Sequence, residues 1–190
     1  MDFYNNPSKV DEYEKMCDEY DGTEIYKVLE SHLTKDSTLL ELGSGPGNDI
    51  RHLRNKYRVT GSDLSDEFLL RCRTRFSDVP FHKLDAVSID TPQVFDGIFS
   101  NKVLHHLELV KLEESLKRQQ QVIKPNGIFA HTFWLGGKEF TMEGMLFKFY
   151  DRDESLGLVS KYFTIRETYD YKEFEQGDSI FIVAQNNKYV

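Results

Sequence analysis

Between residues 38 and 134, short apolar runs alternate with helical patterns so regularly that few folds can accommodate the chain. The strand-like runs cover residues 38–42, 58–62, 80–84, 95–100 and 127–134. Apolar residues at three-to-four spacing mark helices between most of these runs, and a Pro125-Asn126-Gly127 turn ends the longest helix. This alternation predicts parallel strands joined by right-handed crossovers, with helices on both faces of the sheet.

The sequence before this core predicts two helices. Residues 8–20 place aromatic and sulfur-containing side chains on one helix face, formed by Tyr13, Met16, Cys17 and Tyr20. The second helix is expected to begin at Thr23 as its N-cap and to bury Ile25, Leu29 and Leu33.

The sequence after residue 134 has a different pattern. Residues 136–160 are the least regular part, apart from helical spacing of Met142, Met145, Leu146 and Phe149. Residues 163–171 and 179–186 are two β-rich runs, and the Glu175–Asp178 connection between them is short enough only for an antiparallel hairpin. The sheet is therefore expected to finish with an antiparallel pair.

The length of 190 residues suits one sizeable core and is too short for two ordinary domains. We expect one domain over 1–190, with four parts: N-terminal helices over 1–34, a core over 38–134, a segment over 135–160 and a C-terminal hairpin over 161–190. Cys17 and Cys72 lie in no metal-ligand spacing, so reduced thiols and no metal site are expected.

The charge and the apolar content limit the partners. A formal net charge of −8 argues against a broad nucleic-acid-binding surface, because phosphate contacts need clustered lysines and arginines. No run of about 18 apolar residues and no secretory signal pattern occurs. The expectation is a cytoplasmic monomer or homodimer without a membrane partner.

The segment from Leu40 to Asp49 carries the most specific signal. Gly43, Gly45 and Gly47 lack side chains where the chain must turn, and they allow a ligand to lie against the backbone. A dinucleotide-binding loop would have its third glycine at position 48, which is Asn48, and Glu41 would repel a pyrophosphate. A positively charged ligand would instead be attracted by this carboxylate.

Two further carboxylates follow at the ends of the next strands. Asp63 stands at the end of the second strand, 22 residues after Glu41, where a ribose diol could reach it. Asp85, at the end of the third strand, could accept a hydrogen bond from an adenine amino group. Together with the glycine-rich loop, this pattern predicts a site for a cationic nucleoside cofactor.

These segments resemble the successive motifs of class I S-adenosylmethionine-dependent methyltransferases. The matching segments are Glu41-Leu-Gly-Ser-Gly-Pro-Gly47, Gly61-Ser-Asp63, Asp85-Ala86 and the segment from Phe95 to Leu107. Residues 100–106, 131–134 and 177–180 further resemble a small group of compact microbial members. The resemblance implies a Rossmann-like doubly wound, mostly parallel seven-stranded sheet that ends in an antiparallel hairpin.

The resemblance also implies S-adenosyl-L-methionine as the cofactor and S-adenosyl-L-homocysteine as its product. The cofactor-binding residues would be Glu41, Gly43, Ser44, Gly45, Gly47, Asp63, Leu64, Asp85, Ala86, Ser100, Asn101 and Tyr20. Among them, the glycine-rich loop would hold the methionine part, which Ser100 and Asn101 approach from the fourth strand. An N-terminal helix often closes over the cofactor in this family, which gives Tyr13 and Tyr20 a lid role, with core packing as the alternative.

The acceptor is less constrained by the sequence. His105 and His106 follow the fourth strand at the edge of the crevice, where one of them could act as a general base, or the pair could cap and pack the following helix. The aromatic-rich segment 133–150 suits either an acceptor pocket or cap, with residues 135–160 as the possible cap, or ordinary core. A small-molecule acceptor is the first hypothesis. The alternatives are a protein or RNA methyltransferase with a partner subunit, a non-catalytic cofactor-binding protein and, least of all, a nucleotide-dependent dehydrogenase.

Overall fold

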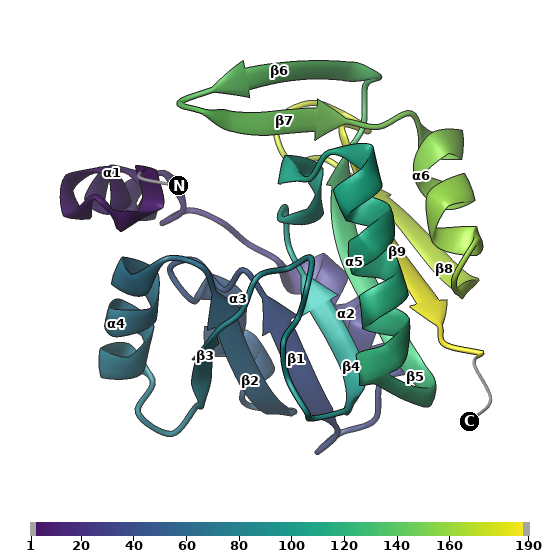
Figure 1. The fold of residues 1–190 in the computed structure, drawn as a ribbon, viewed down its shortest axis with the longest axis horizontal. Helices are drawn as coiled ribbons and strands as arrows, with labels where there is room; N and C mark the ends of the chain where they lie inside the picture. Colours follow the sequence, from purple (N-terminus) through teal and green to yellow (C-terminus); the bar gives the residue numbers. More distant parts are fainter. Residues whose placement is uncertain (1–2, 188–190) are drawn as a thin grey trace.

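The computed structural model describes residues 3–187, so residues 1, 2 and 188–190 of the expected single domain lie outside the described residues. Its main sheet has seven strands in the order β3-β2-β1-β4-β5-β9-β8 (Figure 1). These strands are β1 (Thr38–Leu42), β2 (Arg58–Asp63), β3 (Phe81–Lys83), β4 (Phe95–Ser100), β5 (Ile123–Trp134), β8 (Thr164–Tyr171) and β9 (Ser179–Gln185). Strands β1 to β5 pair in parallel, whereas β9 pairs antiparallel with both β5 and β8. The predicted fold class is confirmed.

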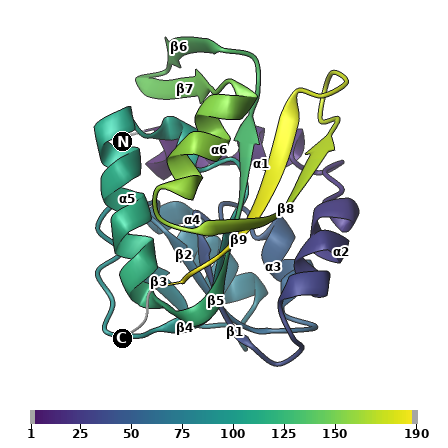
Figure 2. The ribbon, with the colours of Figure 1, turned by 90° about the vertical axis from the view of Figure 1, so that its right-hand side faces the viewer.

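Helices cover both faces of this sheet. They are α1 (Pro7–Met16), α2 (Thr23–His32), α3 (Asn48–Leu53), α4 (Asp66–Arg75), α5 (Leu109–Val122) and α6 (Arg152–Ser160), with short 3-10 turns η1 (Phe3–Asn5) and η2 (Leu104–His106). Figure 2 shows α2 and α3 on one side of the sheet and α5 and α6 on the other. Two hydrophobic clusters correspond to these two sides, and β1 contributes Leu39 to one cluster and Leu40 to the other. This burial on both faces explains why the strands read as continuous apolar runs.

The predicted helix over residues 8–20 is wrong in its length and in its face. The helix α1 ends at Met16, whose side chain is 80% exposed, and Tyr20 lies in the loop that follows. The ring of Tyr13 packs instead against Tyr4 and against Phe68 of α4. Tertiary contacts of Tyr20, described below, determine where the chain leaves the helix.

The helical pattern within residues 136–160 is also wrong where it was expected. Strands β6 (Lys138–Met142) and β7 (Met145–Phe149) form a separate two-stranded hairpin above the main sheet (Figure 1). Glu143 and Gly144 connect them with φ values of 52° and 76°, the conformation that a two-residue hairpin turn requires. This turn signal outweighs the helical spacing of the flanking methionines.

Two smaller boundaries differ from the expectation. Thr23 is the first residue of α2 rather than its N-cap, and its backbone N–H and hydroxyl both donate to the carboxylate of Asp21. The turn at residues 125–127 does not lie outside a strand but forms an irregularity within β5, where Asn126 has a φ of 63°. The sequence correctly predicted a turn at these residues, but the turn lies within β5 and not before the strand.

Candidate active site

The carboxyl ends of the central parallel strands bring together polar residues that are distant in the sequence. Glu41 pairs in register with Gly61 of β2 and with Phe99 of β4, so the ends of the three strands lie side by side. Asp63 is the last residue of β2, and Ser100 is the last residue of β4. Open α/β sheets bind their ligands in the crevice outside this edge.

The glycine-rich loop between β1 and α3 uses its own amides internally. The N–H groups of Ser44 and Gly45 donate to the carbonyl of Ser62 (2.7 Å) and to the carboxylate of Asp63 (2.9 Å), and Gly47 N–H donates to Ser44 (2.8 Å). All three loop glycines have positive φ. A phosphate ligand would need free N–H donors in this loop. Because the N–H groups of Ser44, Gly45 and Gly47 already donate within the chain, the loop offers a ligand a backbone surface rather than an anion site.

Glu41 is buried beside this loop without a cation. Its side chain is 1% exposed, and its Oε2 atom has no hydrogen-bond partner among the described residues. Burial raises the pKa of Glu41 well above its usual range, and the neighbouring carboxylates of Asp49 and Asp63 raise it further. A buried, unpaired carboxyl group of this kind favours the arrival of a positively charged ligand.

Asp63 holds the loop and retains capacity for a ligand. Its two carboxylate oxygens accept from the backbone N–H of Gly45 (2.9 Å) and of Ser65 (2.8 Å), which leaves further lone pairs unoccupied. Burial raises the pKa of Asp63, although these backbone hydrogen bonds oppose the change. Leu64 follows it with a partly exposed side chain that could line the crevice.

A network of side chains crosses the crevice between the N-terminal loop and β5. The Asn101 amide donates to the Tyr20 hydroxyl (2.7 Å) and lies 3.3 Å from an oxygen of Asp49. The other Asp49 oxygen accepts from the Tyr26 hydroxyl (2.6 Å), and Thr132 donates to the Asn101 carbonyl oxygen (2.8 Å). Residues from α2, α3, β5 and two loops are thus joined in one polar cluster.

The segment that carries these residues is similar to known proteins. Residues 39–127, which carry the glycine-rich loop and the carboxylates just described, match the family model described as a methyltransferase domain. Over this segment, which is slightly less than half of the chain, the sequence is similar to that of a methyltransferase domain, and the fold is the class I methyltransferase fold.

Solved structures support this fold over most of the chain. The 1,6-didemethyltoxoflavin-N1-methyltransferase of Burkholderia thailandensis, solved with 1,6-didemethyltoxoflavin and S-adenosylhomocysteine, has a TM-score of 0.75 at 21% identity, covering 87% of this chain and 77% of that one. An S-adenosylmethionine-dependent methyltransferase from Clostridium acetobutylicum has a TM-score of 0.74 at 16% identity, covering 92% of this chain and 98% of that one.

Among curated proteins, a trans-aconitate 2-methyltransferase of Methylobacterium nodulans is 29% identical over 126 residues. The match covers 63% of this chain and 46% of that protein, so the chain spans less than half of the length of this relative. The similarity is therefore to the methyltransferase domain.

Asp85 and Ala86, the residues expected near adenine, lie just beyond β3. Asp85 is exposed, and its carboxylate accepts from Val87 N–H (2.6 Å), which forms a turn. The Ala86 carbonyl accepts from the Ser115 hydroxyl (2.6 Å), so α5 fixes the position of this turn. The second carboxylate oxygen of Asp85 stays available for a ligand.

Ser100 does not direct its hydroxyl into the crevice. Its side chain is fully buried and lies 2.5 Å from Nδ1 of His131, also fully buried, on the neighbouring strand β5. Burial lowers the pKa of His131 to about 3, so this imidazole is neutral. Any contact of Ser100 with a cofactor would involve its backbone.

His105 and His106 lie in η2, beneath the hairpin β6–β7, with their ring centroids 3.9 Å apart. The Nδ1 atom of His106 lies 2.7 Å from the carbonyl of Leu146, which can only accept, so this nitrogen carries the proton and Nε2 has the free lone pair. His105 is 2% exposed, and neither ring nitrogen has a hydrogen-bond partner among residues 3–187. Burial lowers the pKa of both rings, most strongly that of His105.

The aromatic segment predicted as pocket or core forms a stack of rings above the sheet. Trp134 stacks on Phe149 and Phe174, and Phe140 stacks on Phe147, which also contacts both histidines. Phe174 is 74% exposed, so the stack continues to the surface. Neither a pure core role nor a closed pocket describes this arrangement.

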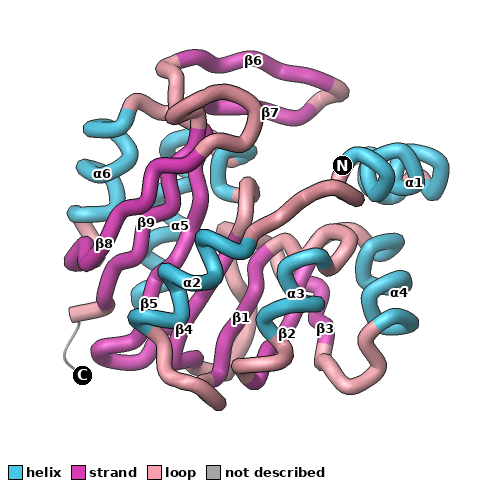
Figure 3. The backbone as a smooth tube through the Cα atoms, turned by 180° about the vertical axis from the view of Figure 1, so that it is seen from behind, coloured by secondary structure: helices cyan, strands magenta, loops and turns pink. Residues whose placement is uncertain are grey.

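The N-terminal segment lies along the crevice. The amide of Asn48 donates to the carbonyl of Cys17 (2.9 Å), and the hydroxyl of Ser65 donates to the carbonyl of Tyr4. Figure 3 shows the loop between α1 and α2 running over the carboxyl end of β1. The position of Tyr20 fits the expected lid, and that of Tyr13, packed on Phe68 of α4, fits the packing alternative.

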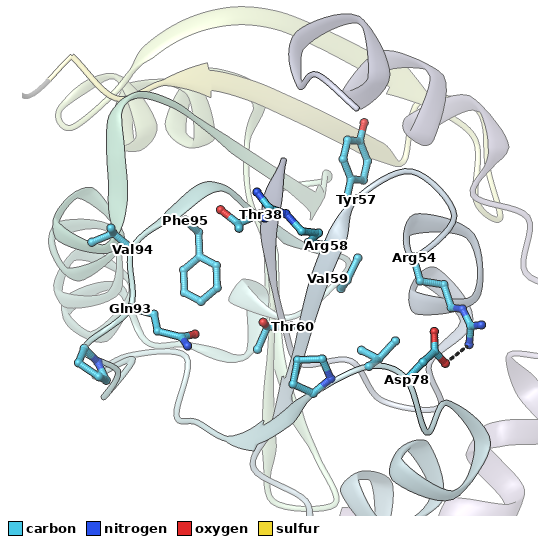
Figure 4. Close-up of a pocket in the computed structure, with 13 residues that line it drawn as sticks. Thr38, Arg54, Tyr57, Arg58, Val59, Thr60, Asp78, Gln93, Val94 and Phe95 are labelled. Atoms are coloured by element: carbon cyan, nitrogen blue, oxygen red, sulfur yellow. Dashed lines mark ion pairs between the residues drawn. The ribbon is translucent and has the colours of Figure 1, made fainter. Parts of the chain in front are cut away.

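A hollow of about 710 Å³ lies elsewhere, at the amino ends of β1, β2 and β4 (Figure 4). Thr38, Arg58 and Phe95, each the first residue of its strand, line it, and an Arg54–Asp78 ion pair (2.9 Å) lies at its edge. It is on the side opposite to the glycine-rich loop and contributes no residue to the crevice.

Sequence reasoning missed four side chains around the crevice: Asp49, Tyr26, Lys102 and Glu173. Asp49 stands in the first turn of α3, where an acidic residue is ordinary, so no local signal marked it. Lys102 has a φ of 55°, and its ammonium group lies 3.1 Å from Glu173 and 3.6 Å from the centre of the Trp134 ring. Burial lowers the pKa of Lys102 to about 8, against the opposing influence of Glu173.

Within residues 3–187, no group of three His, Cys, Asp or Glu side chains is arranged to hold a metal ion. In the same part of the chain, no helix is long and apolar enough to cross a membrane.

Proposed function

We propose that this chain transfers a methyl group from S-adenosyl-L-methionine to a small molecule. The observation that carries the proposal is the unpaired buried carboxyl group of Glu41 beside a glycine-rich loop in which the N–H groups of Ser44, Gly45 and Gly47 already donate within the chain. This combination disfavours a phosphate and favours a cation. It therefore selects an amino-acid-bearing sulfonium cofactor over a dinucleotide.

The other residues of the crevice fit the same cofactor. The glycine-rich loop leaves open space at Gly45, where an added Cβ would meet no atom within 4 Å. Asp63 and Leu64 would bind the ribose side, Asp85 and Ala86 the adenine, and Ser100, Asn101 and Tyr20 the methionine end. When bound, S-adenosyl-L-methionine supplies a methyl group on a positively charged sulfur.

The residues of the chain would act mainly by alignment. Holding two reactants in line is worth roughly 7–11 kcal/mol relative to free encounter, so no base is needed unless the acceptor loses a proton. For such an acceptor, Nε2 of His106 would take the proton, because the Nδ1–H is already directed at Leu146. His105 would hold the neighbouring ring in place.

A small acceptor is supported by the substrates named for its relatives. The Methylobacterium relative acts on trans-aconitate, and the Burkholderia structure contains 1,6-didemethyltoxoflavin, both of which are small molecules. A net charge of −8 disfavours a nucleic acid as the acceptor.

Calorimetry tests the cofactor first. The purified protein should release heat on titration with S-adenosylmethionine and S-adenosylhomocysteine and show none with nicotinamide adenine dinucleotide. Absence of binding to both sulfur compounds would refute the proposal.

Turnover is then measured with methyl-labelled cofactor and cell-extract metabolites. Labelled methyl groups in small molecules support the proposal. Label found only in protein or RNA contradicts it, and so does the absence of any labelled product when the protein binds the cofactor. With the acceptor identified, His106→Gln should lower the rate at neutral pH by about 10²–10⁴-fold if the acceptor must lose a proton. An unchanged rate in a His105→Ala, His106→Ala double variant would exclude a histidine base.

A further inference from the structure

The polar cluster of Tyr20, Tyr26, Asp49 and Asn101 contains a buried carboxyl group, that of Asp49, to which the proposed function gives no role. Asp49 is 8% exposed and lies close enough to Glu41 and Glu173 for their charges to interact. No lysine or arginine pairs with Asp49 among the described residues, because Lys102 is directed at Glu173. Together with the unpaired Oε2 of Glu41, the crevice has two buried carboxyl groups without a cation.

The hydrogen bonds of Asp49 differ in length. It accepts from the Tyr26 hydroxyl at 2.6 Å, whereas its contacts with the Asn101 amide are longer, at 3.3 and 3.5 Å. A carboxylate has about four lone-pair sites, so capacity remains for a strong donor. Burial raises the pKa of Asp49 to about 6, and the Tyr26 hydrogen bond opposes this change.

Tyr20 offers the complementary group. The Tyr20 hydroxyl oxygen accepts a hydrogen bond from the Asn101 amide at 2.7 Å. Among residues 3–187, the hydroxyl donates to no acceptor. Gly22 allows this placement, because a Cβ at that position would lie only 2.6 Å from the Tyr20 hydroxyl and 2.5 Å from the Tyr26 hydroxyl. A hydroxyl donor and a carboxylate that pairs with no lysine or arginine among the described residues are thus held by the same amide, that of Asn101.

We propose that Asp49 and Tyr20 form a clamp for an α-amino acid zwitterion, with Asp49 binding the ammonium group and the Tyr20 hydroxyl donating to the carboxylate. The clamp rests on the proposed function, since the amino-acid end of the cofactor is its ligand. The unpaired carboxyl group of Glu41 lies nearby and would gain a negative charge once a bound ammonium group favours its ionised form, and Asn101 positions both clamp residues. This assigns to Asp49 a binding role that its place in the helix does not suggest.

The experiment compares two ligands that share adenosine and differ in the amino-acid end. Calorimetry gives the Kd of S-adenosylhomocysteine, which has the zwitterion, and of 5′-methylthioadenosine, which lacks it. Asp49→Asn should raise the Kd of the first about tenfold or more and that of the second less than about twofold. Tyr20→Phe should act in the same direction with a smaller effect.

Asp63→Asn is the matched control, because it should weaken both ligands to the same degree through the shared ribose. If Asp49→Asn weakens both ligands equally, or neither, the clamp is refuted while the proposed function stands. If the wild-type protein binds neither ligand, the proposed function itself fails. Circular dichroism and melting curves check that the variants fold, and if Asp49→Asn does not fold, Tyr20→Phe decides by the same comparison.

Discussion

Burial links single carboxyl groups of this molecule to the pH dependence of its stability. Asp49 has a usual pKa of 3.8, which burial raises to about 6 in the folded chain. Between these values the folded protein retains a proton that the unfolded chain has lost. The free energy of unfolding should therefore fall as the pH rises from about 4 to about 6.

Asp49→Asn should flatten this dependence, because the amide cannot ionise. The measurement is urea unfolding at pH 4, 5, 6 and 7, with the exposed Asp85→Asn as the control that follows the wild-type curve. Glu41 and Asp63, whose pKa values are also raised by burial, should contribute slope that remains in the variant. A variant curve as steep as that of the wild type would show that Asp49 is ionised throughout.

At the scale of an element, two glycines of the loop between β1 and α3 have different surroundings, so substitutions at them should affect folding and ligand binding differently. Gly47 has a φ of 83°, and an added Cβ would lie 2.6 Å from the Phe76 ring and 3.1 Å from the Cys72 sulfur. Gly45 has a φ of 47° and faces open space. The two positions therefore tolerate a methyl group very differently.

Gly47→Ala should lower the free energy of unfolding by about 2–4 kcal/mol, from backbone strain and from overpacking. Gly45→Ala should cost only about 1–2 kcal/mol but should weaken S-adenosylhomocysteine binding, because the methyl group enters the space left for the ligand. Denaturant unfolding and calorimetry on both variants measure the two effects. Equal losses of stability would contradict the assignment.

The hairpin β6–β7 is a second element, and its stability should be separate from that of the main sheet. It pairs with no strand of the main sheet, and its stability depends on ring contacts such as Phe147 with Phe140 and with the two histidines. An isolated two-stranded hairpin is only marginally stable in water. Its opening would expose His105 and His106 to an acceptor.

Phe147→Ala should therefore raise amide hydrogen exchange in β6 and β7 while leaving exchange in β1 and β4 unchanged. The melting temperature should change little, because Phe147 belongs to neither core cluster. Mass spectrometry after timed exchange resolves the two regions. Faster exchange across the whole sheet would show that the hairpin is part of the cooperative core.

At the scale of the whole molecule, ligand binding should be visible as stabilisation. S-adenosylhomocysteine at about 100 times its Kd adds about 2.7 kcal/mol to the folded state. For a chain of this length that corresponds to a rise in Tm of about 5–10 °C. Differential scanning calorimetry measures the shift, and nicotinamide adenine dinucleotide at the same concentration is the control that should give none.

The sequence was sufficient to predict the sheet because β1, β2 and β4 are buried on both faces and their helices alternate with them. It was insufficient wherever a contact between distant residues decided the outcome. Tyr20 leaves the helical pattern to reach Asn101, 81 residues away, and Asp49 looks like an ordinary first-turn residue until Tyr26 and Asn101 surround it. At Glu143 and Gly144 a local turn signal is present in the sequence, but the neighbouring methionines have helical spacing, and the two signals predict different structures.

The position of β9 constrains the order in which the sheet can form. It lies between β5 and β8 and follows both in the chain, so neither partner can complete its ladder before β9 has been inserted. The β4–β5 pairing can form earlier, whereas β8 stays outside the sheet until its successor fills the gap. Closure of this side is thus a late event with a large loop-entropy cost, and a chain paused before it would expose the edge of β5 to association with other strands.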